Sequence, residues 1–212
     1  MIIVEGPDGA GKTQLVGKLA RELKLPVADK VVASDTTAMT DLVKWTEDNV
    51  ARGFQPTIFD RHRLISEPIY GPILKSRQDP KFCDLTWMSQ QLWLFYGCKP
   101  VIIYCLPDIR TVRRNVTMVE TDNQVVAGHI AAIYAAYVNR ATLDFTRGVG
   151  RLYNYETTRF DDLAGWVQFQ IEERVPHSDR VQFPQPRAEG IHSRSDVGGL
   201  GSAARRPRSH HG

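Results

Sequence analysis

The stretch GPDGAGKT, residues 6–13, determines how the rest of the chain is interpreted. It fits the pattern GxxxxGK[ST], in which glycines permit a tight turn whose backbone N–H groups point at phosphate oxygens. A short apolar run, residues 2–4, precedes it, and residues 15–23 follow with apolar side chains at helical spacing. Because a phosphate-binding loop needs a strand before it and a helix after it, we favour a phosphate site over a glycine-rich turn without a ligand.

The side chains of this loop predict its chemistry. Lys12 is expected to reach the β- and γ-phosphates of a nucleotide, and the Thr13 hydroxyl is expected to bind Mg²⁺. The helix that begins at Lys12 adds the positive end of its dipole. The residues predicted to hold the nucleotide are Gly6, Pro7, Asp8, Gly9, Ala10, Gly11, Lys12 and Thr13.

Length and composition limit the class of protein. With 212 residues, 42% of them hydrophobic, the chain is long enough for one well-buried domain but not for a second of ordinary size. The three cysteines lack the paired spacing of metal sites, which favours packing roles in a reducing compartment. No segment approaches the roughly 18 apolar residues of a membrane span. We therefore expect a soluble, unexported, cytoplasmic protein without a membrane partner.

The net charge of +3 is concentrated at one end of the chain. Residues 176–212 contain six arginines and three acidic residues, so this segment carries the whole surplus. Residues 175–212 are rich in Gly, Ser, Pro and Arg, a composition that predicts a disordered basic tail. The tail is either a solubilising extension or a weak electrostatic arm for nucleic acid. The folded domain is expected to span residues 1–174.

The pattern of this domain alternates between strands and helices. The expected strands are residues 2–4, 27–33, 56–60, 100–106 and 151–155. The expected helices are residues 15–23, 39–50, 85–96 and 161–173, with two more that begin near residues 108 and 122. Such alternation is typical of an α/β protein, in which helices cover both faces of a parallel sheet.

A second cluster of polar residues follows the strand expected at residues 56–60. Asp60, at the carboxyl end of that strand, is well placed to hold Mg²⁺ beside the phosphate loop. Arg61 would enter the same cleft and could clamp an anionic acceptor or the phosphoryl group in flight. His62 is either a structural, hydrogen-bonded histidine or a catalytic one.

Arginines also cluster after the strand expected at residues 100–106. Arg110, Arg113 and Arg114 fall at i, i+3 and i+4, so their side chains share one helix face. They favour a lid, residues 107–121, that closes over a triphosphate and neutralises transition-state charge. The alternative is a solvated helix face on which Asp108 pairs with one arginine.

Missing motifs narrow the nucleotide-binding classes. A GTPase would carry a guanine-reading Asn-Lys-x-Asp after a late strand, and neither Asn139 nor Asn154 stands in that context. A motor or helicase would need a longer chain to couple hydrolysis to motion. A small, single-domain kinase remains.

Four features together resemble thymidylate kinases and deoxynucleoside kinases: residues 5–13, residues 60–62, the arginine-bearing helix and residues 152–155. The resemblance implies a three-layer P-loop kinase fold with a five-stranded parallel sheet, and Mg²⁺-ATP as the donor. It also implies that the segment after the last strand covers the adenine, which would place Thr157, Thr158 and Arg159 near the base of ATP.

The segment that usually grips the acceptor in this family differs here. Thymidylate kinases carry Arg-Glu-Pro after the second strand and deoxynucleoside kinases a catalytic glutamate, whereas this chain has ASDTT at residues 33–37. Asp35 is either a replacement general base or a helix N-cap. In the expected mechanism, Lys12 and Mg²⁺ orient the γ-phosphoryl group, arginines absorb its charge, and Asp35 or Asp60 positions the acceptor hydroxyl.

The acceptor is predicted from a second resemblance. Glu67 and Pro68, within LISEPIYGP, resemble a segment of bacteriophage relatives, some of which phosphorylate the hydroxymethyl group of hydroxymethyl-deoxyuridine in DNA. That reaction requires the target base to leave the base stack of the DNA, and an aromatic side chain could support the extruded base. The candidates are Tyr70, Trp87 and Trp93, although the two tryptophans are better interpreted as core residues. The alternative acceptor is a free thymidine-type nucleotide. A third hypothesis is a nucleotide-binding regulator without enzymatic activity. If the chain is a phage protein, it would act in the host cytoplasm. The sequence does not determine the oligomeric state, and a homodimer is one possibility.

Overall fold

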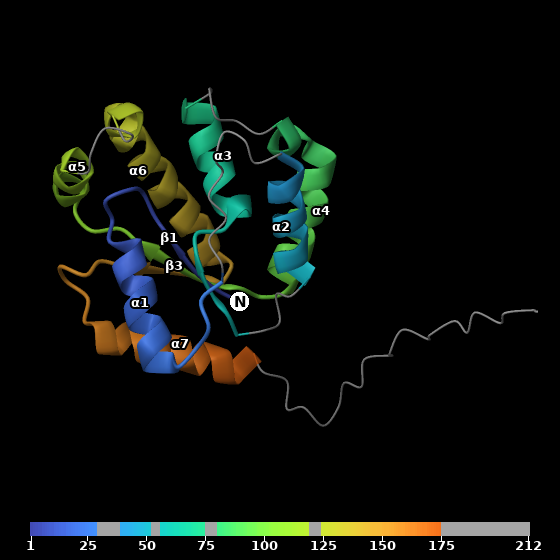
Figure 1. Cartoon of the computed structure of the whole chain (residues 1–212). Coiled ribbons are helices and arrows are strands. Elements are labelled where there is room, and N and C mark those ends of the chain that lie inside the picture. The colour runs from blue at the N-terminus through green and yellow to red at the C-terminus, as the bar shows by residue number, and fades with distance from the viewer. Residues whose placement is uncertain (29–38, 52–55, 75–79, 119–123, 175–212) are drawn as a thin grey trace, which may run out of the picture. The chain divides into compact units, whose positions relative to one another are not determined.

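The computed structural model describes residues 1–28, 39–51, 56–74, 80–118 and 124–174 (Figure 1). All of its helices and strands lie within the compact unit Met1–Val175. The segment predicted as a basic tail, residues 175–212, lies outside the described residues. None of the described helices is long and apolar enough to cross a membrane.

Four parallel strands form the sheet at the centre of the unit. They are β1 (Ile2–Glu5), β2 (Ile58–Asp60), β3 (Val101–Cys105) and β4 (Gly150–Tyr153), in the order β2-β1-β3-β4. Ile3 stands opposite Phe59 on one side and Ile102 on the other, so β1 is paired along both edges. All residues of β1 and β3 are buried, as expected of parallel strands that helices cover on both faces.

The described residues contain four strands where the resemblance implied five. The missing one is the strand expected at residues 27–33, of which only Val27 and Ala28 are described. Val27 forms a single parallel bridge with Ile58, and the N–H of Ala28 donates to the carbonyl oxygen of Ile58 at 2.8 Å. The chain therefore begins to pair along the outer edge of β2, where a fifth strand would be added.

Helices cover both faces of the sheet, which confirms the predicted α/β architecture. In Figure 1, α1 (Lys12–Leu23) and α7 (Phe160–Arg174) lie together on one side, and α3 (Arg63–Leu74) and α6 (Gln124–Thr146) lie on the other. Further helices are α2 (Met39–Ala51), α4 (Leu85–Gly97), α5 (Ile109–Thr117) and the 3₁₀ turn η1 (Pro80–Cys83). Leu19 of α1, Ile103 of β3 and Ile133 of α6 belong to the core and are fully buried, so both helical layers pack on the sheet through apolar side chains.

Helix α3 is an element that the sequence pattern did not predict. Pro68 and Pro72 lie inside it, and proline usually interrupts a helix because it lacks an N–H and its ring crowds the preceding turn. Burial of apolar side chains such as Leu64 and Ile65 outweighs that cost here. As a consequence, the chain after β2 turns back across the sheet and brings Tyr70 toward the phosphate loop.

Two expectations about packing were wrong. Trp93 was interpreted as core, yet it is 77% exposed on α4, whereas Trp87 of the same helix is buried as expected. Cys83 was expected to pack, yet it is exposed, whereas Cys105 is buried in β3. The sequence around Trp93 is apolar, but only packing decided which face of α4 would be buried.

Candidate active site

The phosphate loop joins β1 to α1 through glycines with positive φ angles. Gly6 has a φ of 142°, and a Cβ atom at this residue would lie 2.4 Å from the carbonyl oxygen of Cys105. Gly9 has a φ of 76°, and a Cβ atom there would lie 2.9 Å from the carbonyl oxygen of Val112. Neither separation leaves room for a side chain, so these two glycines allow β3 and α5 to approach the loop closely.

Lys12 places its amino group against the inner side of this loop. Its side chain is buried at the start of α1, and Nζ donates a hydrogen bond of 2.6 Å to the carbonyl oxygen of Pro7. Burial lowers the pKa of Lys12, and the neighbouring Arg61 lowers it further. An anion bound beside Nζ would favour the charged form again, so the loop is suited to receive a phosphate.

Thr13 and Asp60 meet at the entrance of the loop although 47 positions separate them in the sequence. Oγ1 of Thr13 donates a hydrogen bond of 2.8 Å to Oδ2 of Asp60. A hydroxyl and a carboxylate oxygen suit Mg²⁺, which in nucleotide sites keeps several waters and takes few protein ligands. Within the described ranges, no group of three or more His, Cys, Asp and Glu side chains could hold a metal ion. Because Mg²⁺ in nucleotide sites is also bound by phosphates, the pair fits an ion shared with a bound nucleotide.

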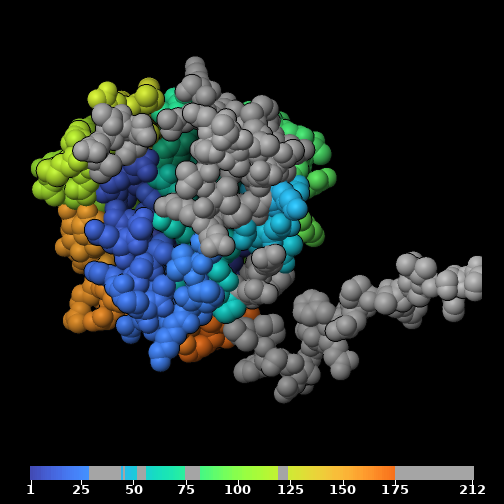
Figure 2. Space-filling view, viewed as in Figure 1, coloured from blue at the N-terminus to red at the C-terminus, as the bar shows by residue number. Residues whose placement is uncertain are grey.

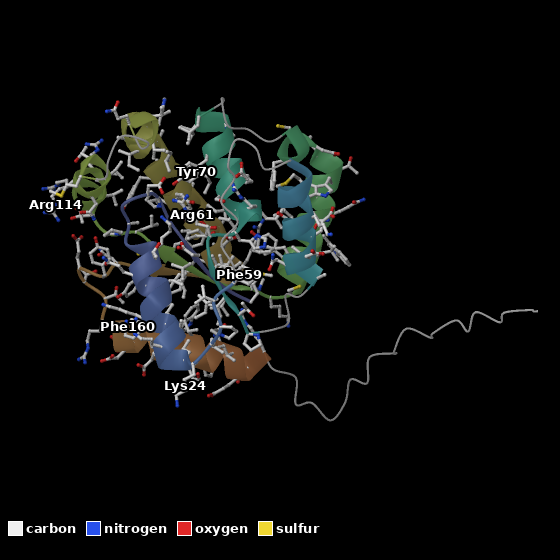
Figure 3. The ribbon with its side chains drawn as sticks, in the orientation of Figure 1. Lys24, Phe59, Arg61, Tyr70, Arg114 and Phe160 are labelled. Atoms are coloured by element: carbon white, nitrogen blue, oxygen red, sulfur yellow. The ribbon has the colours of Figure 1, made fainter. Side chains whose placement is uncertain are left out.

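Arg61, Asp8 and Tyr70 form a compact cluster beside the loop, and Figure 3 shows the arginine and the tyrosine next to each other. Nη2 of Arg61 donates to Oδ1 of Asp8 and, at 3.1 Å, to the Tyr70 hydroxyl. That hydroxyl in turn donates to Oδ2 of Asp8 at 3.0 Å, while the guanidinium lies over the tyrosine ring at 5.0 Å. Both oxygens of the Asp8 carboxylate thus accept hydrogen bonds. Burial opposes ionisation of Asp8, but Arg61 and Lys12 outweigh it and lower the pKa of the carboxyl below its ordinary value.

His62 is packed as a structural residue. Its side chain is fully buried, and its ring contacts the rings of Phe59 and Phe95 at centroid distances of 5.8 and 5.0 Å. Burial lowers the pKa of His62 to about 3, so the imidazole is neutral at physiological pH. Of the two interpretations that the sequence left open, this environment favours the structural one.

Glu5 is a buried carboxylate that sequence reasoning did not single out as a site residue. It ends β1 directly before the loop and is fully buried. Oε1 accepts a hydrogen bond of 2.6 Å from the backbone N–H of His62, and Oε2 accepts one of 2.9 Å from the Tyr137 hydroxyl. Burial raises the pKa of Glu5 above its ordinary value. Tyr137 comes from the middle of α6, and no local sequence pattern connects it to the loop.

Helix α5 packs on the loop with its apolar face. Val112 and Val116 are buried, and Asn115 donates a hydrogen bond of 2.8 Å from Nδ2 to the carbonyl oxygen of Gly9. The three arginines predicted for a lid are exposed: Arg110, Arg113 and Arg114. Arg110 pairs with Asp108 at 3.7 Å, as the solvated-face alternative expected, and 90% of its side chain is exposed. The structure places these arginines on the helix that contacts the loop, with their side chains in solvent, and residues 119–121 of the predicted lid lie outside the described ranges.

The turn after β4 contacts the loop from another direction. A Cβ atom on Gly11 would lie 3.2 Å from Cε1 of Tyr155, so the tyrosine ring covers this glycine. The Glu156 carboxylate accepts hydrogen bonds from the N–H of Asp108 at 2.9 Å and from the Thr111 hydroxyl at 2.6 Å. This turn and the beginning of α5 are therefore joined directly. In Figure 2 the blue N-terminal atoms reach the surface beside the yellow-green atoms of α5 and the orange atoms of the C-terminal segment.

The residues predicted near the adenine belong to this same turn. The N–H groups of Thr157 and Thr158 both donate to the carbonyl oxygen of Asn154, at 3.1 and 2.7 Å, which closes the turn. Arg159 follows, exposed, and pairs with Asp161 at 3.4 Å. The three residues thus follow Tyr155, whose ring covers Gly11, and their contact with an adenine stays a prediction. Asp35, the predicted base, lies outside the described residues.

Comparisons with known proteins show which solved structures share this fold. No family model matches the chain, and no curated protein matches it either. Its fold is similar to that of the YorR protein of Bacillus subtilis, solved in complex with phosphorylated GDP, with 19% sequence identity, a TM-score of 0.52, and coverage of 81% of this chain and 95% of that one. It is also similar to deoxyadenosine kinase from M. mycoides, solved with dCMP and dCDP, with 13% identity, a TM-score of 0.50, and coverage of 81% and 98%. These likenesses establish a shared fold.

Proposed function

We propose that the chain is an ATP-dependent phosphotransferase. The observation that carries this proposal is the convergence of Lys12, Thr13, Asp60 and Arg61 around one glycine loop at the carboxyl ends of β1 and β2. In parallel α/β sheets, ligands bind at this edge. A buried ammonium, an oxygen pair suited to Mg²⁺ and a guanidinium are the groups that transfer of a γ-phosphoryl group requires.

The mechanism follows from where these groups stand. Lys12 and the loop amides hold the phosphate chain, and Thr13 and Asp60 would hold Mg²⁺, which neutralises charge on the β- and γ-phosphates when bound. An acceptor oxygen attacks the γ-phosphorus, the bond from that phosphorus to the bridging oxygen breaks, and ADP leaves. Arg61 stabilises the negative charge that develops on the group in transit. Asp60 accepts a hydrogen bond from Thr13 where Mg²⁺ would bind, so it is less suited to act as the general base. We therefore assign to Asp35 the role of accepting the proton of an acceptor hydroxyl.

The acceptor is proposed to be a nucleoside-type molecule that binds beside Asp8, Arg61 and Tyr70. Two sources of such an acceptor remain. The hydroxymethyl group of hydroxymethyl-deoxyuridine in DNA is favoured by two exposed features. Trp93 could stack on a base, and the arginines of α5 could contact the phosphates of a DNA strand. A free thymidine-type nucleotide is favoured by the two similar folds, each solved with a free nucleotide.

The assay that tests the function uses ATP labelled in its γ-phosphate, together with Mg²⁺. One set of reactions contains free thymidine, dTMP and hydroxymethyl-dUMP, and another contains duplex or single-stranded DNA with hydroxymethyl-deoxyuridine. Label in the DNA identifies the DNA-borne acceptor, and label confined to a free compound identifies a nucleotide kinase. A protein that binds ATP but transfers no label to any acceptor contradicts the phosphotransferase proposal and supports a nucleotide-binding regulator.

A further inference from the structure

The backbone at Arg61 adopts a conformation that arginine rarely takes. Arg61 lies between the end of β2 and the start of α3 and has a φ of 75°. In this left-handed region the side chain of an L-residue crowds its own backbone, so a residue other than glycine remains there only when its surroundings hold it. The cause of this conformation is therefore to be found in the contacts of residues 61 and 62.

Two successive residues of β1 hold the two amides of this connection. The N–H of Arg61 donates to the carbonyl oxygen of Val4 at 3.0 Å, and the N–H of His62 donates to Oε1 of Glu5 at 2.6 Å. The first bond continues the pairing of β2 with β1. The second bond uses a side chain, and a carboxylate acceptor makes it stronger than a bond between neutral groups.

The Glu5 carboxylate is itself held from the opposite direction. Its second oxygen accepts a hydrogen bond of 2.9 Å from the hydroxyl of Tyr137, whose side chain is also fully buried. A buried acceptor between two buried donors has little freedom to rotate. Helix α6 thereby supports the connection between β2 and α3 through a single carboxylate.

The connection in turn directs the guanidinium of Arg61 toward the phosphate loop, where it reaches Asp8 and Tyr70. We propose that Glu5 is a positioning residue, which holds the left-handed turn at Arg61 through the N–H of His62 and so keeps the guanidinium beside the transferred phosphoryl group. The phosphoryl contact of Arg61 rests on the proposed function, whereas the link from Glu5 to the orientation of Arg61 stands on geometry alone.

The test compares variants that separate the hydrogen bond from the charge. Glu5→Ala removes both, Glu5→Gln retains an amide oxygen that can accept from the N–H of His62, and Tyr137→Phe removes the second donor. Tyr104→Phe is the matched control, because Tyr104 is equally buried and donates its hydroxyl to a different buried carboxylate, that of Asp144. The measurements are kcat, KM for ATP, the melting temperature and the NMR resonance of the Arg61 Nε–H group, which is assigned by its loss in Arg61→Lys.

The expected result is a split between turnover and binding. Glu5→Ala lowers kcat at least tenfold with KM for ATP changed less than twofold, Tyr137→Phe lowers kcat severalfold, and Glu5→Gln recovers most of the loss. The Arg61 resonance moves in Glu5→Ala toward its position in Asp8→Asn, in which the ion pair is broken, and does not move in Tyr104→Phe. A folded Glu5→Ala or Tyr137→Phe variant with wild-type kcat overturns the proposal, as does a Glu5→Gln variant no better than Glu5→Ala.

The same set distinguishes this inference from the proposed function. If Glu5→Ala does not fold, the test rests on kcat and on the Arg61 resonance in two other variants, Tyr137→Phe and Glu5→Gln. Both are compared with the control Tyr104→Phe. If the wild-type protein transfers no phosphate while the Arg61 resonance responds as expected, the phosphotransferase proposal fails and the positioning role of Glu5 stands. A resonance that is unchanged in Tyr137→Phe, and in Glu5→Ala where that variant folds, overturns the positioning role whatever the activity.

Discussion

The hydroxyl of Thr13 donates a hydrogen bond of 2.8 Å to the carboxylate of Asp60, which joins the first turn of α1 to the end of β2. Asp60→Asn keeps the size of the side chain but removes a charge that Mg²⁺ would use. We expect the Mg²⁺ concentration for half-maximal turnover to rise about tenfold or more, and EDTA to abolish turnover in the wild-type protein. A titration of activity with MgCl₂ measures this, with Asp162→Asn as a control at an exposed carboxylate. An unchanged Mg²⁺ requirement in Asp60→Asn would remove Asp60 from the metal site.

Lys12 is the buried cation of the loop, and its replacement should affect chemistry more than folding. Lys12→Ala is expected to lower kcat at least about a hundredfold, because a charge aimed at the transferred group is lost from a water-poor site. Lys18→Ala serves as the control, since Lys18 lies on the same helix with an exposed side chain. Steady-state kinetics with labelled ATP decide the matter. Activity of Lys12→Ala within threefold of the wild type would contradict a phosphate clamp at this loop.

Gly9 lies where the loop contacts α5. In Gly9→Ala the new Cβ atom would lie 2.8 Å from Cγ2 of Val116 and 2.9 Å from the carbonyl oxygen of Val112, at a φ of 76°. We expect the free energy of unfolding to fall by about 1–3 kcal/mol, as is typical of overpacking, and nucleotide affinity to fall with it. Gly17→Ala is the control, because its Cβ would meet only the tip of the Arg21 side chain at 3.7 Å. Urea denaturation compares the two, and equal stabilities would show that α5 does not press on the loop.

The neutral, buried His62 makes stability dependent on pH. Its pKa falls from 6.5 to about 3 on folding, so between these values the unfolded chain binds the extra proton. Its stabilising contribution is therefore complete above pH 6.5 and is lost as the pH falls toward 3, by at most about 1.4 kcal/mol per pH unit. His62→Asn, which retains an acceptor for the N–H of Leu64, should flatten this part of the curve of unfolding free energy against pH. A wild-type slope in His62→Asn would contradict a neutral His62 in the folded protein.

Glu156 joins the turn after β4 to the beginning of α5, and both segments contact the loop. Glu156→Ala removes the acceptor for the N–H of Asp108 and for the Thr111 hydroxyl. We expect KM for ATP to rise about threefold to tenfold, the range for one or two hydrogen bonds at a surface, with kcat little changed. Glu172→Ala is the control on α7, where the carboxylate accepts from Gln168 of its own helix. If kcat falls while KM stays constant, Glu156 acts on chemistry rather than on the nucleotide site.

Much of the candidate site could be predicted because its residues follow a local rule. GPDGAGKT, with an apolar run before it and apolar residues at helical spacing after it, places Lys12 and Thr13 at the start of a helix. Asp60 and Arg61 follow a short buried strand, and parallel strands bring their carboxyl ends to one edge of the sheet. The positions of β1, β3, α4 and α6 follow in the same way from apolar runs and helical periodicity.

The remaining parts of the site depend on contacts that no local pattern encodes. Tyr70 reaches Asp8 because α3 forms despite its two prolines, and Tyr137 reaches Glu5 across 132 positions of the sequence. Glu156 meets Asp108 only because β4 lies beside β3. Each of these contacts joins residues from separate elements, so it exists only after the sheet has assembled.

The sequence by itself determined the phosphate loop, the parallel α/β architecture and the polar residues at the ends of the strands, because these depend on spacing within short segments. Only the tertiary structure decided the left-handed turn at Arg61, the exposure of the α5 arginines and of Trp93, and the neutral state of His62. The physical reason is that burial and backbone strain are properties of the packed molecule: they depend on which distant residue supplies the hydrogen bond or covers the ring.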